Sequence, residues 1–185
     1  MKKRAVIFMA DGFEEIEAIT PIDLLRRADV AVEMVSISES LTVVGAHGIT
    51  VQCDSLFSHF NLHGIDVYIL PGGAGHKLLA KNAQLGVVLK QAHNQGVLIA
   101  AICAAPSILG DLDILLNKRA CCFPGFEGSL NCKEVVMNEP VVVDGNVITS
   151  RGAGTAYQFG LAIVAKFFCK DKADKLASQT IFTSN

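Results

Sequence analysis

Residues 98–110 read "LIAAICAAPSILG" and place Cys103 where an apolar run gives way to two alanines and a proline. The apolar run is typical of a strand that is covered on both faces, and the residues after Cys103 favour a helix. Small neighbours such as Ala101, Ala104 and Ala105 permit a tight bend between them. Cys103 is therefore either a small core residue or a nucleophile on a sharp turn, where a helix N-terminus would stabilise its thiolate.

The rest of the chain alternates between predicted strands and predicted helices. Alternation of this kind predicts βαβ units, a mostly parallel sheet and an α/β fold. Strands are expected at residues 4–10, 30–38, 66–70, 97–102, 119–123 and 133–137, and hairpins at 41–54 and 140–150. Helices are expected at 14–28, 74–96, 154–168 and 172–182.

Composition limits the classes of function. The 185 residues suit one domain, 1–185, and are 51% hydrophobic with a net charge of −2. No basic stretch gives a strong signal for nucleic-acid binding. No run approaches the roughly 18 apolar residues of a membrane span. Asp11 and Gly12 interrupt the N-terminal apolar run too early for a signal peptide, so we expect a cytoplasmic protein.

The six cysteines show neither a C-x-x-C pair nor a zinc-like grouping with histidine. We therefore expect free thiols and no metal. Cys121 and Cys122 are adjacent in the predicted strand 119–123, so their side chains should point to opposite faces. The residue types leave the roles of five cysteines open: Cys53, Cys121, Cys122, Cys132 and Cys169.

Three segments should meet at the carboxyl edge of the sheet, because each follows a predicted strand: residues 11–17, residues 72–75 and Cys103. Glu17 is either an acid that suits the helix dipole or a carboxyl of raised pKa that donates to the sulfur or acts as a base. Gly72 and Gly73 form either a plain turn or a close approach of backbone amides to a reacting oxygen.

A histidine base for Cys103 is poorly supported. Of the five histidines, His76 alone lies near this edge, and none follows Cys103. This disfavours a protease or amidase with a Cys–His pair.

Four blocks resemble the ThiJ/PfpI superfamily, in the branch of the Parkinson-disease-associated protein and its bacterial YajL-like relatives. They are "GFEEIEAITPIDLLRRA" (12–28), "VYILPGG" (67–73), "LIAAICAAPSIL" (98–109) and "ITSRGAGTAYQFGLAIV" (148–164). The resemblance implies a flavodoxin-like sandwich with helices on both faces of the sheet, usually as a homodimer.

The resemblance also implies roles for residues. Cys103 would be the nucleophilic, oxidation-prone cysteine, Glu17 its partner carboxyl, and Gly73 and Ala104 the backbone donors beside the thiol. Cys53 resembles a secondary cysteine near the dimer interface of some relatives. The residues expected to line the substrate pocket are Glu14, Gly72, Phe123 and Gly152.

Three positions depart from the family pattern. Ala104 stands where protease-like members have histidine, which argues against a peptidase. Phe123 stands where the animal branch has histidine, which leaves the site without that imidazole and resembles the YajL-like branch. Ala153 replaces the proline of the usual closing motif, which changes the stiffness of that turn.

The resemblance implies three functions. The first is a glyoxalase III-like or deglycase-like enzyme without a cofactor, which converts methylglyoxal or glyoxal, or repairs their adducts, in oxidative and carbonyl stress defence. The second is a redox sensor or redox-regulated chaperone that uses oxidation of Cys103. The third, implied by the name ThiJ, is a role in thiazole-phosphate biosynthesis, although no phosphate loop supports it.

Overall fold

A seven-stranded sheet forms the centre of the computed structural model, which describes residues 2–183. The strands lie in the order β10–β11–β7–β6–β1–β2–β5, and all are parallel to their neighbours except β10. Their bounds are β1 Arg4–Met9, β2 Ala31–Ser36, β5 Ser55–Leu56, β6 Val67–Leu70, β7 Leu98–Ile102, β10 Val141–Asp144 and β11 Val147–Ser150. The order β2–β1–β6–β7–β11 is that of a flavodoxin-like sheet, which confirms the predicted fold class.

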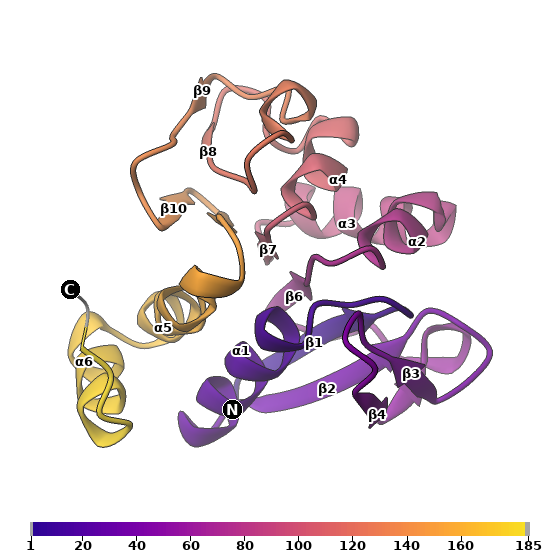
Figure 1. The fold of residues 1–185 in the computed structure, drawn as a ribbon, viewed down its shortest axis with the longest axis horizontal. Coiled ribbons are helices and arrows are strands. Elements are labelled where there is room, and N and C mark those ends of the chain that lie inside the picture. Colours follow the sequence, from indigo (N-terminus) through magenta and orange to yellow (C-terminus); the bar gives the residue numbers. More distant parts are fainter. Residues whose placement is uncertain (1, 184–185) are drawn as a thin grey trace.

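Helices cover both faces of this sheet (Figure 1). One layer consists of α1 Glu15–Arg27, α5 Ala156–Phe167 and α6 Lys170–Gln179, and the other of α2 His76–Lys81, α3 Ala83–Asn94 and α4 Pro106–Asp111. Two small sheets lie outside the central one: β3 Thr42–Val44 with β4 Thr50–Gln52, and β8 Arg119–Ala120 with β9 Glu134–Val135. Three short 3₁₀ helices complete the fold: η1 Phe57–His59, η2 Glu127–Ser129 and η3 Ala153–Thr155.

The first strand shows why its sequence is apolar throughout. Successive side chains of a strand point to opposite faces, so both sets are buried when helices cover both sides. Ile7 and Met9 pack with α1 and α5 in one core cluster, whereas Val6 and Phe8 pack with α3 and α4 in the other. Two cores therefore hold β1 in the middle of the sheet and fix the position of the turn that follows it.

Several predicted elements have other bounds in the structure, and the largest difference is a helix that is divided in two. The single helix expected over residues 74–96 is two helices, because Asn82 lies between α2 and α3 in an extended conformation. Its side chain accepts a hydrogen bond from the amide of Leu85 at 3.0 Å and so caps α3. The hairpins expected at 41–54 and 140–150 are present as β3–β4 and β10–β11.

The strand expected at residues 119–123 is also shorter than predicted. β8 ends at Ala120, so Cys121 and Cys122 follow it in irregular backbone. Both are fully buried, and they belong to different core clusters. The backbone donor of Cys121 bonds to the Thr149 hydroxyl oxygen at 3.0 Å instead of continuing the strand ladder.

Within residues 2–183, no helix has both the length and the apolar character that crossing a bilayer requires.

Candidate active site

Cys103 lies on a strained turn directly after β7, three residues before α4 begins. Its φ of 67° is in the left-handed region, which costs free energy for a residue with a β-carbon. Two backbone hydrogen bonds hold this conformation: the Cys103 amide donates to the Ser150 carbonyl at 2.9 Å, and the Phe123 amide donates to the Cys103 carbonyl at 2.8 Å. The turn presents the thiol at the carboxyl edge of the sheet while its backbone stays paired.

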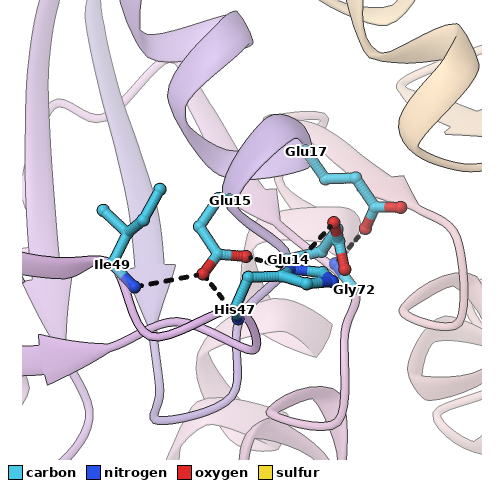
Figure 2. A network of polar contacts seen from close by, with 6 residues as sticks. All are labelled: Glu14, Glu15, Glu17, His47, Ile49 and Gly72. Carbon is cyan, nitrogen blue, oxygen red and sulfur yellow. Dashed lines mark hydrogen bonds and ion pairs between the residues drawn. The ribbon is translucent and has the colours of Figure 1, made fainter.

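Glu17 brings a buried carboxyl to this thiol from the first turn of α1. The residue is only 1% exposed, and its side chain is hydrogen-bonded to that of Cys103. Figure 2 shows Glu17 reaching toward Gly72, whose amide donates to Oε2 at 3.0 Å. The expected contact between thiol and carboxyl is therefore present.

The Gly72–Gly73 turn closes the other side of the thiol. A β-carbon at Gly72 would lie 2.5 Å from Glu17 Oε2 and 3.0 Å from Cys103 Sγ, so only glycine leaves room for the pair. Gly73 has a φ of 77°, and its amide donates to the Cys103 sulfur together with the amide of Ala104. These are the two residues that the family resemblance implies as backbone donors.

Burial dominates the electrostatics of the pair. It raises the pKa of Glu17 to about 7, against the lowering effect of hydrogen bonds from Cys103 and Gly72. Burial and the neighbouring Glu17 carboxylate raise the pKa of Cys103 to about 12, which the Gly73 and Ala104 amides offset only in part. The expectation that a helix N-terminus lowers the pKa of Cys103 is therefore wrong in direction, because burial and the Glu17 charge raise it. The raised pKa of the Glu17 carboxyl agrees with the expectation from the sequence.

The remaining predicted pocket residues lie around this pair. A β-carbon on Gly152 would be 3.1 Å from the Phe123 ring and 3.8 Å from Glu17 Oε1, so Gly152 and Phe123 border the carboxyl. Phe123 is 46% exposed and lies at the surface. Glu14 is half-buried and raises the pKa of Glu17 through its charge, but its nearest charged partner is His47 rather than Cys103.

Sequence reasoning missed a second carboxyl network beside the first. Figure 2 shows Glu15 between α1 and the hairpin of β3 and β4. Its carboxylate accepts from the His47 amide at 2.7 Å and the Ile49 amide at 3.4 Å, and contacts His47 Nδ1 at 2.8 Å. Burial opposes ionisation of Glu15, but these hydrogen bonds outweigh it and hold the pKa at about 2.

The Glu15 network has a structural consequence for the site. Glu14, Glu15 and His47 bring three ligand-type atoms within 4.8 Å of one another. Both carboxylate oxygens of Glu15 are already occupied by the hairpin. The cluster therefore ties residues 47–49 to the start of α1, the helix that carries Glu17. No spacing in the sequence marks this pairing, since its partners are 32 residues apart.

The site places Cys103 on a strained turn at the carboxyl edge of the sheet. A buried carboxyl and two backbone amides contact its sulfur. These features define an α/β protein whose candidate active site is centred on a single cysteine. The chain belongs to the DJ-1/PfpI family, whose family model matches residues 3–166. This confirms the resemblance to the ThiJ/PfpI superfamily.

The comparisons extend over the whole chain. Protein dj-1beta of Drosophila melanogaster is 34% identical over 187 residues and covers 100% of both chains. A protein named a deglycase from Pyrococcus abyssi is 32% identical over 83% of this chain and 93% of its own. The solved structure of oxidized Toxoplasma gondii DJ-1 has a TM-score of 0.94 at 31% identity, covering 98% of this chain and 100% of that one.

Proposed function

We propose that this protein is a cysteine-dependent glyoxalase or deglycase that acts on methylglyoxal, glyoxal or their adducts without a cofactor. The observation that carries the proposal is the contact between the Cys103 thiol and the buried Glu17 carboxyl, with two backbone amides on the sulfur. The Pyrococcus abyssi relative that is named a deglycase supports the same class of activity. Ala104, which replaces a histidine next to the cysteine, argues against a peptidase.

The first proposed step is addition of sulfur to the aldehyde carbon. The ionised Glu17 carboxyl takes the thiol proton as the carbon–sulfur bond forms, so no free thiolate of high pKa has to accumulate. The aldehyde oxygen becomes an anion beside the Gly73 and Ala104 amides, which stabilise it, and protonation gives a hemithioacetal.

The second proposed step moves a proton between adjacent carbons. Glu17, after returning the thiol proton to the former aldehyde oxygen, removes the proton from the hemithioacetal carbon and delivers it to the neighbouring carbonyl carbon. The hydroxyl proton of the hemithioacetal moves to the oxygen of that carbonyl, which leaves a 2-hydroxy thioester on Cys103. Water then hydrolyses the thioester, releases the hydroxy acid and restores the thiol. The sum is one methylglyoxal and one water giving one lactate, so no external oxidant or reductant is consumed.

Purified protein without added cofactor tests this function. We expect methylglyoxal to disappear in proportion to the amount of protein, with lactate appearing in equal amount by chromatography. An adduct assay run after free aldehyde has been removed distinguishes repair of adducts from simple aldehyde removal. Absence of lactate at high protein concentration would refute the enzymatic proposal.

Turnover should rise with pH through about 7. The pKa of Glu17 is raised to about 7 by burial, and a general base works only when it is ionised, so activity should fall as the carboxyl becomes protonated below that pH. His47, whose pKa is also raised by Glu15 and Glu14, is another titratable group near the start of α1 that could produce such a step. H47Q should keep the pH profile, and a wild-type profile that stays flat from about pH 6 to 8 would contradict the role of Glu17.

An alternative proposal is a redox sensor or redox-regulated chaperone. The amides on the Cys103 sulfur would stabilise an oxidised, anionic sulfur as well as a reacting oxygen. The relative from Toxoplasma gondii is described as oxidized, which supports oxidation as a state of a family member. Loss of a holdase effect on oxidation, without aldehyde turnover by the reduced protein, would favour this alternative.

Mild peroxide should oxidise Cys103 before the other thiols. The pKa of Cys103 is also raised, to about 12, but Glu17 is hydrogen-bonded to its thiol and can accept the proton directly. Burial and the charge of Asp54 raise the pKa of Cys53 to about 11, and burial and the charge of Glu127 raise that of Cys122 to about 12, but neither carboxylate is hydrogen-bonded to its thiol. Peptide mass spectrometry should find sulfenic or sulfinic acid at Cys103 first. Cys169 is exposed and serves as an internal control, so earlier oxidation there, or at Cys121 or Cys122, would contradict the prediction.

We also propose a homodimer, as the family resemblance implies. Apolar side chains on α1 and on the hairpin of β3 and β4 are exposed in the single chain: Ile16 by 54%, Ile49 by 56% and Val44 by 41%. Exposed apolar side chains that cluster on neighbouring elements are typical of an interface. Light scattering should give twice the mass of one chain, and I16E should shift it toward the monomer. A monomeric wild type would refute the proposal.

A further inference from the structure

The turn at Gly72 and Gly73 uses each of its backbone polar groups. The Gly72 amide donates to Glu17 and its carbonyl accepts from the Glu14 amide at 3.2 Å. The Gly73 amide donates to the Cys103 sulfur. Among residues 2–183, the Gly73 carbonyl accepts only from His76, through its backbone amide at 3.2 Å and through Nδ1 at 2.7 Å. One histidine therefore supplies the hydrogen bonds on the C-terminal side of this turn.

The side chain of His76 provides the shorter of the two bonds to Gly73. A carbonyl only accepts, so Nδ1 must carry the hydrogen, and this fixes the tautomer of the neutral ring. Gly73 has a positive φ of 77° and no β-carbon, so a glycine at this position does little by itself to restrict rotation about its φ and ψ angles. The Glu14 amide holds the peptide that carries the Gly73 N–H, through the Gly72 carbonyl, and the bond from His76 Nδ1 holds the peptide after Gly73. Together the two bonds restrict rotation at Gly73 and so the direction of its amide.

The His76 ring is itself held in place. It is 9% exposed, and its centroid lies 5.4 Å from that of Phe126 in an edge-to-face arrangement. Phe126 belongs to the same loop as Phe123, whose amide donates to the Cys103 carbonyl. The loop of Phe123 and Phe126 therefore contacts the turn at Cys103 directly, and it contacts the Gly73 turn through the ring of His76.

We propose that His76 is a positioning residue that aims the Gly73 amide at the Cys103 sulfur. Orientation of the Gly73 amide toward the oxygen anion of the aldehyde rests on the proposed function. Its orientation toward the Cys103 thiol does not depend on that function. His76 makes no contact with the sulfur that the structure records, so it acts through Gly73 and not as the base of a Cys–His pair.

Three variants separate the hydrogen bond from the bulk of the ring. H76F keeps an aromatic ring against Phe126 but has no donor. H76N places an amide nitrogen near the position of Nδ1 and can still donate to Gly73. H59F removes an exposed histidine in η1, at the edge of the sheet, as the matched control. Circular dichroism establishes that each variant is folded at the assay temperature.

The readout is the rate at which iodoacetamide alkylates Cys103 at pH 8, measured by peptide mass spectrometry. Weaker donation from the Gly73 amide raises the thiol pKa, and one unit lowers the thiolate fraction about tenfold. We expect H76F to react about tenfold more slowly, with H76N and H59F within about threefold of wild type. Methylglyoxal turnover should fall in the same order, mainly in kcat, because a misaimed donor weakens transition-state stabilisation.

Unchanged alkylation in folded H76F would overturn the proposal, and so would H76N reacting as slowly as H76F, since the ring rather than the donor would then matter. If H76F does not fold, H76A replaces it in the same comparison with H76N. If wild type shows no aldehyde turnover but the alkylation order holds, the enzymatic function fails and the positioning role of His76 stands.

Discussion

C103S is expected to lower methylglyoxal turnover by roughly 10⁴-fold or more, the range in which removal of an attacking nucleophile falls. Serine keeps the shape of the side chain, so the turn with its φ of 67° and its hydrogen bonds to Ser150 and Phe123 should remain. A hydroxyl has a far higher pKa than a thiol, and Glu17, with a pKa of about 7, is too weak a base to activate it. The measurement is lactate formation per protein chain under saturating aldehyde.

The control for C103S is C169S, which removes an exposed thiol at the start of α6. C169S should keep full turnover, because Cys169 lies on a different element from every residue of the site. Turnover by C103S within tenfold of wild type would show that aldehyde is consumed elsewhere on the protein and would refute the proposed mechanism.

The elements that the sequence predicts best are the strands in which every side chain is buried. β1, β6 and β7 are apolar on both faces because helices cover both, and this pattern is readable in the sequence. The strand–helix alternation then places residues 11–17, residues 72–75 and Cys103 at one edge of the sheet. The contact between Cys103 and Glu17 was expected on that basis together with the family resemblance.

The features that the sequence does not predict depend on contacts between side chains and backbone that leave no periodic pattern in the sequence. Asn82 splits a continuous helical period through a side-chain cap, which a periodic pattern does not contain. Glu15 and His47 pair across 32 residues, and each on its own resembles an ordinary surface residue. The pKa of Cys103 was predicted in the wrong direction because burial, which opposes the thiolate, is a property of the assembled site.

E17Q is expected to lower turnover by roughly 10²–10⁴-fold, the usual effect of losing a general base. Glutamine fits the same space, accepts from the Gly72 amide through its carbonyl oxygen, and donates to the sulfur through its nitrogen. It cannot take the thiol proton or carry a proton between the two substrate carbons. Alkylation of Cys103 should survive, because removing the Glu17 carboxylate also removes a charge that raises the thiol pKa.

Stability gives an independent check that E17Q acts at the predicted carboxyl. The pKa of Glu17 is raised from 4.5 to about 7, so its contribution to folding is fully present below pH 4.5 and is lost as pH rises through 7. This pKa shift corresponds to a loss of about 3 kcal/mol in the free energy of unfolding. E17Q should recover part of that free energy at pH 8, measured by urea unfolding. E39Q, which changes an exposed glutamate, is the matched control for both assays.

The two readouts of E17Q separate the proposed functions. Lost turnover with preserved alkylation assigns the proton transfer to Glu17 and leaves the nucleophile intact. Full turnover in E17Q would refute the proton-transfer role and favour the redox alternative, in which Glu17 only donates a hydrogen bond to an oxidised sulfur. In that case glutamine, which also donates, should preserve the order of peroxide oxidation among the six thiols, with Cys103 still first.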